Sequence, residues 1–250
     1  VWSTWPAVQC ALIRVRSARN GNCGRQLCVF VLVAVWGYRL THNFVARGGI
    51  GHEDWRYSDM RKQFGKHFWW ISLFSVFLGQ TIFMFAACLS LYAALGSEAN
   101  LGWMDAIASA VSIAAILLEA MADIQMDQFQ AAKREKRTDK QVIDTGVWGW
   151  SRHPNYLGEL MWWWGLWLFS SSSSPSWVVS GPVLITLLFV CISVKLMEDR
   201  QLQNKPDAYA RYMRQVGSPL LLLPPSANRW LGEQLARSYH AGTDESSSDS

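Results

Sequence analysis

Long apolar segments are the feature that most constrains the fold of this chain. Residues 68–96, 101–122 and 176–197 are each long enough to cross a bilayer, which takes about 20 apolar residues in a helix. Shorter apolar runs at 26–40 and 157–174 bring the expected number of crossings to about five, within limits of four to seven. The sequence therefore predicts an all-α, polytopic integral membrane protein built as a helical bundle.

Composition agrees with a membrane location. Hydrophobic residues make up 50% of the chain and charged residues 17%, whereas about a quarter of the residues of soluble domains are charged. The 15 tryptophans gather at the ends of apolar runs, and such amphipathic rings favour the membrane–water boundary. The lipid bilayer is the first predicted partner.

Charge is modest and uneven along the chain. The net charge is +4, and the basic loop "KREKRTDK" at 133–140 is predicted to face the cytoplasm by the positive-inside tendency. Nucleic acid is not an expected partner, because nothing in the sequence indicates an exposed basic face on a soluble fold. The five cysteines form no CxxC pair, and no histidines recur at metal-ligand spacing. We therefore expect no metal and interpret the thiols as small buried hydrophobes.

The two ends of the chain differ from its middle. The chain opens with Val1, and we expect that the true N-terminus is missing together with a helix or two; "WPAVQCALIRV" reads as the end of one of these. Residues 1–225 are expected to form one membrane domain, in which "SPLLLLPP" lies on the membrane. Residues 226–250 are expected to be a polar, disordered tail.

A polar cluster, "SRHPNYLGE", stands directly before an apolar, tryptophan-rich helix. Pro154 suits the first helical position, which places His153 at or near the N-cap. Arg152 and His153 then add donors beside unpaired first-turn amides, and this arrangement suits a phosphate. Asn155 and Glu159 share a helix face and can bind an amide or a sugar hydroxyl. The cluster predicts a nucleotide-type ligand, and interfacial anchoring is the alternative.

Carboxylates at four-residue spacing form a stripe on one face of another apolar helix. Glu119, Asp123 and Asp127 lie in "LLEAMADIQMDQF". A carboxylate in a bilayer normally faces a partner or a wet cavity, and Asp123 is the best candidate to accept from ligand hydroxyls or to pair with an arginine. The alternative is that all three simply mark the cytoplasmic end of this helix.

Two further groups carry charge next to apolar runs. Arg39 lies within or just after such a run, where it requires a carboxylate or a phosphate, and Arg47 begins a flexible glycine-containing loop. Glu198 ends the last apolar helix, and Tyr209 and Tyr212 then share one face of a short amphipathic helix. That helix is interpreted either as a ligand lid or as a surface helix capping the bundle.

The sequence resembles a known family. "TGVWGWSRHPNYLGELMWWWGLWL", with "EAMADIQMDQF" and "WGYRLTHNFVARGG…EDWRY", is similar to the C-terminal domain family of steroid 5-alpha-reductases. The likeness is closest to a branch of uncharacterised membrane proteins that share "SRHPNYxGE", and it covers roughly residues 1–225. Isoprenylcysteine carboxyl methyltransferases carry a related "RHPxYxG" element.

The resemblance implies an NADPH-dependent reductase of a carbon–carbon double bond in a steroid, sterol or other lipid. Hydride would reach the β-carbon of an enone while a hydrogen-bond donor polarises the carbonyl. Matched by motif, the residues implied to bind NADPH are Arg39, Arg47, Asp123, Arg152, His153, Asn155, Tyr156, Glu159, Glu198, Tyr209 and Tyr212.

The substrate half of the family pattern is not recognisable. Where the reductases have a catalytic tyrosine this chain has Trp36, and Tyr38 is the nearest candidate for that role; the partner glutamate would lie upstream of Val1. Two alternatives stay open: an S-adenosylmethionine-dependent membrane methyltransferase and a non-enzymatic lipid-binding relative. In a eukaryote the expected location is the endoplasmic reticulum, with the cofactor site facing the cytoplasm.

Overall fold

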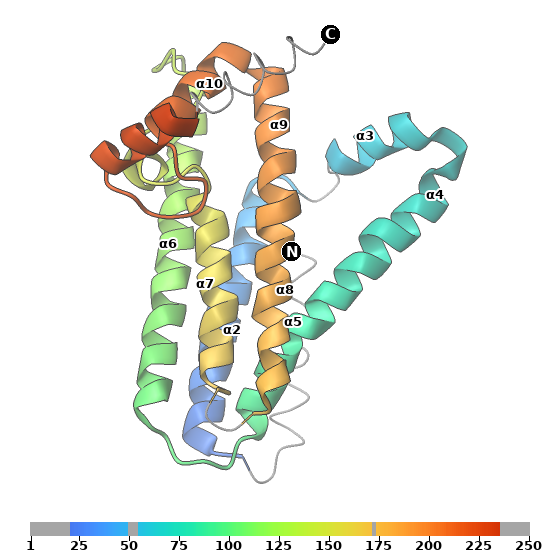
Figure 1. Ribbon diagram of the computed structural model, residues 1–250, viewed down its shortest axis with the longest axis vertical. Coiled ribbons are helices and arrows are strands. Elements are labelled where there is room, and N and C mark those ends of the chain that lie inside the picture. Colours follow the sequence, from blue (N-terminus) through green and yellow to red (C-terminus); the bar gives the residue numbers. More distant parts are fainter. Residues whose placement is uncertain (1–20, 50–54, 172–173, 236–250) are drawn as a thin grey trace, which may run out of the picture. The chain divides into compact units, whose positions relative to one another are not determined.

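Helices are the only regular secondary structure in the parts of the chain that its structure, a computed structural model, describes. These parts are residues 21–49, 55–171 and 174–235, and they contain no strand (Figure 1). Four helical stretches among them are long and apolar enough to cross a membrane: Cys23–Ala46, Arg56–Gly96, Trp103–Arg134 and Ser176–Asn204. The prediction of an all-α polytopic membrane protein is thus confirmed. The further helix expected near the N-terminus lies outside the described residues.

Helix α2 (Cys23–Ala46) is longer than its apolar run. Its N-cap is Asn22, whose side chain accepts hydrogen bonds from the backbone N–H groups of Gly24 and Arg25 at 3.1 and 3.2 Å, and this bonding satisfies amides that have no partner inside the helix. The cap places the start three residues before the predicted segment 26–40. With 24 residues the helix is about 36 Å long, so it can span a hydrocarbon core of about 30 Å.

The second stretch is too long to lie wholly within a bilayer. Its 41 residues correspond to about 60 Å of helix, twice the hydrocarbon thickness. Gly65 has φ +48°, a left-handed conformation that favours glycine, and it separates a polar first helix from the apolar remainder. The successive elements are α3 (Trp55–Phe64), a 3₁₀ turn (Gly65–His67), α4 (Phe68–Ile71), a π-helical segment (Ser72–Leu78) and α5 (Gly79–Gly96).

Helix α7 is shorter than predicted. It follows α6 (Trp103–Arg134) and a 3₁₀ turn (Gly146–Gly149), and runs only from Pro154 to Leu168. Ser170 ends it early, because both its backbone N–H and its hydroxyl donate to the carbonyl of Trp167, at 2.9 and 2.8 Å. At 15 residues, or about 22 Å, α7 falls short of a full crossing.

The last membrane stretch is continuous, and ordered structure extends past it. Its elements are a 3₁₀ turn (Ser176–Val179), α8 (Ser180–Leu188), a π-helical segment (Phe189–Ser193) and α9 (Val194–Asn204), followed by α10 (Pro206–Gln215). Residues 225–235 form a further helix. The tail expected from 226 is therefore helical over its first ten residues, and the rest of it lies outside the described residues.

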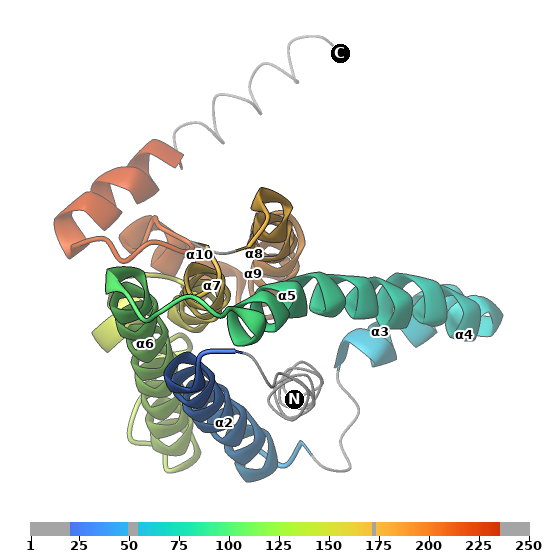
Figure 2. The ribbon, with the colours of Figure 1, turned by 90° about the horizontal axis from the view of Figure 1, so that it is seen from below.

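The chain divides into two compact units, the first comprising residues 1–113 and 161–186. In this unit α2 lies beside the first part of α6, as both overall views show (Figures 1 and 2). The core is aromatic: the fully buried ring of Trp36 stacks on Trp162 with centroids 4.9 Å apart and meets Trp163 edge-on at 5.7 Å. Trp36 is therefore a packing residue of α2 in this structure.

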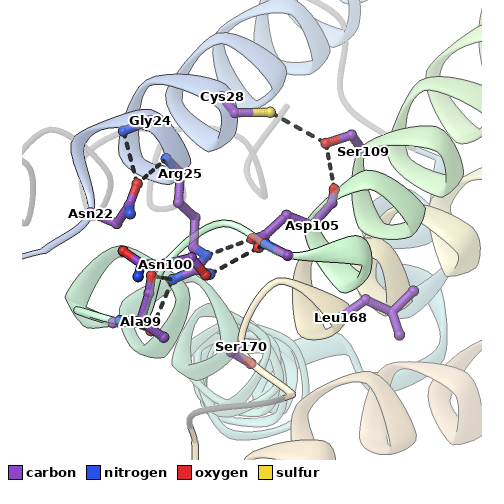
Figure 3. Close-up of polar contacts among 12 residues, drawn as sticks. Asn22, Gly24, Arg25, Cys28, Ala99, Asn100, Asp105, Ser109, Leu168 and Ser170 are labelled. Carbon is purple, nitrogen blue, oxygen red and sulfur yellow. Dashed lines mark hydrogen bonds and ion pairs between the residues drawn. The ribbon is translucent and has the colours of Figure 1, made fainter.

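A buried ion pair joins α2 to α6 in the same unit (Figure 3). The Arg25 side chain donates from Nε to Asp105 Oδ1 at 2.6 Å and from Nη2 to Oδ2 at 2.9 Å. Its remaining hydrogen bonds go to Ser97 Oγ and to the carbonyls of Ala99 and Asn100. Asp105 thus has its counter-charge in the first turn of α2.

The second unit comprises residues 114–160 and 187–250, and in it α6 and α7 pack closely at Gly158. A Cβ at this position would overlap Glu119 Cγ and approach the Ala115 carbonyl oxygen to 3.2 Å. Gly158→Ala is expected to lower the free energy of unfolding by about 1–3 kcal/mol through overpacking, measured by thermal unfolding in detergent.

Gly102→Ala is the matched control for that substitution, because a Cβ there has no neighbour within 4 Å. Equal stability of the two variants would contradict the close contact between α6 and α7.

Candidate functional site

The polar cluster predicted at the start of α7 forms in the second unit as expected. Pro154 is the first residue of the helix, and the carbonyl of His153 accepts the N–H of Leu157 at 3.1 Å. His153 is therefore the N-cap and Pro154 the N1 residue, which confirms the predicted helix start. The His153 ring, by contrast, does not cap the helix and is available for contacts elsewhere.

A C-terminal segment is bound to the backbone just before α7. We call residues 216–235 the C-terminal strap. Its Ser218 and Pro219 carbonyls accept the N–H groups of Arg152 and His153, both at 3.0 Å, and the N–H of Leu223 donates to the Trp150 carbonyl at 3.0 Å. These bonds satisfy backbone groups of an extended segment and bring two regions about 65 residues apart into register.

Arg152, His153 and Glu198 form a buried polar triad. Arg152 is only 5% exposed; its Nε donates to Glu198 Oε1 at 2.7 Å, and its Nη1 donates to the carbonyls of Val216 and Gly217 at 2.9 and 2.6 Å. His153 Nε2 lies 3.1 Å from the same carboxylate oxygen. Because an ionised carboxylate only accepts, Nε2 carries the hydrogen. The triad thus ties the start of α7 to α9 and to the strap.

Aromatic rings extend the triad along α7. The His153 imidazole stacks on Tyr156 with centroids 5.2 Å apart and an interplanar angle of 13°. Tyr156 in turn meets Phe189, in the π-helical segment before α9, edge-on at 5.0 Å. The stack therefore places two aromatic rings next to the residue pair His153–Glu198.

Tyr209 and Tyr212 of α10 are both buried against this part of the unit. The Tyr212 hydroxyl donates to the Trp148 carbonyl at 2.6 Å. Burial raises the pKa of both phenols well above the usual value, and for Tyr209 the nearby charge of Glu198 adds to this rise. Both hydroxyls are therefore protonated donors at neutral pH. Burial, together with the charge of Lys133, also lowers the pKa of Lys205, one turn before Tyr209.

Tyr212→Phe is expected to destabilise the protein by about 1–2 kcal/mol, because it removes the donor for the Trp148 carbonyl. Tyr209→Phe is the matched control: it is equally buried, and no hydrogen bond of its hydroxyl to another described residue is found. Thermal unfolding of the two variants in the same detergent measures the difference. If Tyr209→Phe lost as much stability as Tyr212→Phe, the assigned role of the Tyr212 hydroxyl would be wrong.

Asn155 and Glu159 lie one helical turn apart on α7, and both are partly buried. The Asn155 Oδ1 atom is shielded from solvent and has no hydrogen-bond partner among the described residues. Buried polar atoms are nearly always paired, so such an atom requires an explanation, and a bound ligand or water is one. Asn155 is the residue of the cluster that most directly indicates a missing donor.

The carboxylate stripe on α6 grades from buried to exposed. Glu119 is buried against Gly158, Asp123 is partly buried, and Asp127 is exposed near the end of the helix. Asp123 shares the second unit with the start of α7, so its predicted role is compatible with the structure of that unit.

The remaining predicted residues lie on or next to α2, in the first unit. Arg39 is partly buried, and Arg47 is the exposed C-cap of the helix. Tyr38 is 73% exposed, with its ring 6.0 Å from that of His42. Its catalytic role stays a prediction.

Asn228 is the residue of this region that sequence reasoning missed. It is fully buried; its Nδ2 donates to the carbonyls of Trp150 and Leu223, both at 2.9 Å, and its Oδ1 accepts the N–H of Ser218 at 2.9 Å. It lies within the tail predicted to be disordered. No local pattern identifies it, because its partner Trp150 is 78 positions away.

The described part of the chain contains neither a candidate group of metal ligands nor a disulfide. No group of three histidine, cysteine, aspartate or glutamate side chains is found there that could hold a metal ion. The cysteines at 23, 28, 88 and 191 are free thiols, and Cys10 lies outside the described residues.

Comparison with known proteins places the chain in a family. An uncharacterized protein of Schizosaccharomyces pombe is 27% identical over 219 residues, which cover 77% of this chain and 62% of that relative, so the chain spans about three fifths of its length. No solved structure matches the chain significantly. The model of a family described as "Protein of unknown function (DUF1295)" matches residues 1–216, and the chain therefore belongs to the DUF1295 family.

Proposed function

We propose that the protein is a membrane-bound, NADPH-dependent reductase of a carbon–carbon double bond in a lipid enone such as a steroid or sterol. The observation that carries the proposal is the buried Asn155 Oδ1, an acceptor without a partner among the described residues, at the motif that resembles the reductases. A carboxamide or amino N–H of a nucleotide cofactor would supply the missing donor.

The residues around Asn155 fit such a cofactor. The ring of Tyr156, which is only partly buried and stacks on His153, could pack against an aromatic base. The protonated Tyr209 hydroxyl provides a further donor in the same unit. NADPH would supply the hydride for the β-carbon of the enone, and the protein would supply binding, orientation and exclusion of water.

The proposed orientation places this site on the cytoplasmic face, where NADPH is found. The basic residues 133–140 continue directly from α6 in the same unit as the site, and short basic loops favour the cytoplasmic side. In a eukaryotic cell we propose the endoplasmic reticulum, on the resemblance alone.

An S-adenosylmethionine-dependent methyltransferase is the second candidate, and one observation favours it. The described hydrogen bonds of the Arg152 side chain go to Glu198 and to the carbonyls of Val216 and Gly217. An arginine engaged inside the protein is less available for the phosphates of NADPH, and S-adenosylmethionine has no phosphate.

The experiment is a thermal-stability titration of the detergent-purified protein with NADPH and, separately, with S-adenosylmethionine. A ligand at 100 times its Kd stabilises the folded state by about 2.7 kcal/mol, and we expect this shift with NADPH. A shift with S-adenosylmethionine alone would overturn the proposed reductase function in favour of a methyltransferase. If neither ligand shifted the thermal stability, the remaining interpretation would be a non-enzymatic, lipid-binding relative.

Asn155→Ala is expected to abolish the NADPH shift while leaving the ligand-free protein as stable as the wild type, or more so. Removing a buried acceptor that has no partner recovers its desolvation penalty, which a purely structural asparagine would not allow. Asn204→Ala, at an exposed position on α9, is the control. An undiminished NADPH shift in Asn155→Ala would place the cofactor elsewhere.

A further inference from the structure

We propose that the C-terminal strap (residues 216–235) is a membrane-inserting segment. Its exposed apolar side chains Leu221, Leu222 and Trp230 would enter the bilayer at the edge of the hydrocarbon core. The inference is independent of the proposed enzymatic function.

The exposed residues of α6 define where that edge lies. Exposed apolar side chains occur along this helix from Trp103 to Ile124, and Trp103 itself is 71% exposed. The distance between these positions is about 32 Å at 1.5 Å per residue, close to the 30 Å of a hydrocarbon core. Beyond Ile124 the exposed positions of α6 are polar, namely Asp127, Gln128, Gln130 and Arg134. The membrane boundary on α6 is therefore near Ile124.

The 3₁₀ turn before α7 is bound to α6 at this level. The Trp148 indole N–H donates to the Ala122 carbonyl at 3.1 Å, and the N–H of Val147 donates to Gln125 Oε1 at 3.0 Å. These two partners lie on either side of Ile124. The backbone that leads into α7 therefore runs along the membrane boundary.

The strap is attached to the same backbone. The Trp150 carbonyl accepts the N–H of Leu223 at 3.0 Å and the Nδ2 of Asn228 at 2.9 Å. Leu221 and Leu222 directly precede one of these anchors, and Trp230 is two residues after the other. The strap is thus held within a few ångströms of the level where the bilayer changes from hydrocarbon to headgroups.

The strap has one face turned to the protein and one turned away from it. Asn228 is fully buried, and a Cβ on Gly232 would overlap the backbone of Arg214. Leu221 and Trp230 are 62% and 64% exposed, and Leu222 is exposed as well. In water, each such side chain would leave apolar area unburied, which is unfavourable. Leucine inserts into the acyl boundary and tryptophan prefers the interface.

The bilayer is the occupant that this geometry selects. At the level of Ile124 the membrane spans already require lipid, so the outward face of the strap meets the bilayer without an additional partner. Arg229, beside Trp230, is exposed and suits the headgroup layer. Because the strap also binds Arg152 and His153, bilayer contact and the order of the α7 start are coupled.

Photo-crosslinking in phosphatidylcholine nanodiscs tests the proposal with the full chain. Benzoylphenylalanine is introduced singly at Leu222 and at Trp230, with Leu117 on α6 as the lipid-facing reference and Arg137 as the polar control; both are exposed. Adducts are identified by intact mass.

We expect lipid adducts at Leu222 and Trp230 at a level comparable to Leu117, and about tenfold more than at Arg137, as for an inserted amphipathic segment. Crosslinks to a second copy of the chain would overturn the proposal in favour of self-association. Adduct yields at both strap positions no higher than at Arg137 would show that the strap lies in water. The use of two positions guards against misfolding of either single variant.

Discussion

Asp105→Ala is expected to lower the stability of the detergent-solubilised protein by about 3–5 kcal/mol, because it leaves the Arg25 guanidinium buried without a counter-charge. Arg25 is 1% exposed and makes two short bonds to this carboxylate. Asp105 Oδ2 also accepts the N–H of Gly102 at 2.9 Å, so the substitution removes the support of the loop that enters α6 as well. Chemical or thermal unfolding followed by circular dichroism measures the loss.

Two comparisons show whether the charge is responsible. Arg137→Ala breaks the exposed Arg137–Glu135 pair and should change stability by less than about 1 kcal/mol. The double variant Arg25→Met with Asp105→Leu removes both charges and should recover most of the loss, since apolar replacement of a buried pair is often neutral. A double variant as unstable as Asp105→Ala would mean that shape, and not charge, determines the effect.

Glu198→Ala is expected to have the second large effect, also about 3–5 kcal/mol, because Arg152 and His153 share this one carboxylate. Arg152 also donates to the Val216 and Gly217 carbonyls. Loss of the Glu198 carboxylate should therefore also loosen the contact between the strap and the start of α7. Hydrogen exchange of residues 150–153 and 216–223 measures that loosening separately from global unfolding.

Asp199→Ala is the matched control, since this neighbour on α9 has the same charge and is exposed. It should lie within about 0.5 kcal/mol of the wild type, as surface substitutions usually do. If Asp199→Ala and Glu198→Ala were equally destabilising, the net charge of α9 would explain the effect, and the triad would not. Unchanged exchange of the strap in Glu198→Ala would contradict the coupling through Arg152.

Local patterns predicted the elements of this fold well, and the errors lie at their ends. Apolar runs located the membrane stretches. The end of α7 and the start of α2 were missed by several residues, because hydrogen bonds of Ser170 and Asn22 determine them. Hydropathy carries no information about the hydrogen bonds that begin or end a helix.

The candidate site was predicted less completely. Pro154 and His153 were placed correctly because the cap and the N1 position are local preferences. The partners of Arg152 were not predicted: a phosphate was expected, whereas the structure describes Glu198 and two carbonyls. Asn228 was assigned to a disordered tail, although it binds the backbone at Trp150.

The sequence alone determined that this chain is an all-helical membrane protein and where a polar helix start interrupts its apolar segments. These properties follow from hydropathy and from short-range backbone preferences, which act within a few residues. Only the tertiary structure decided which charges meet, as in Arg25 with Asp105 and Arg152 with Glu198, because each pair is separated by tens of residues. It also left Asn155 Oδ1 without a partner among the described residues, since that depends on what packing brings near the atom.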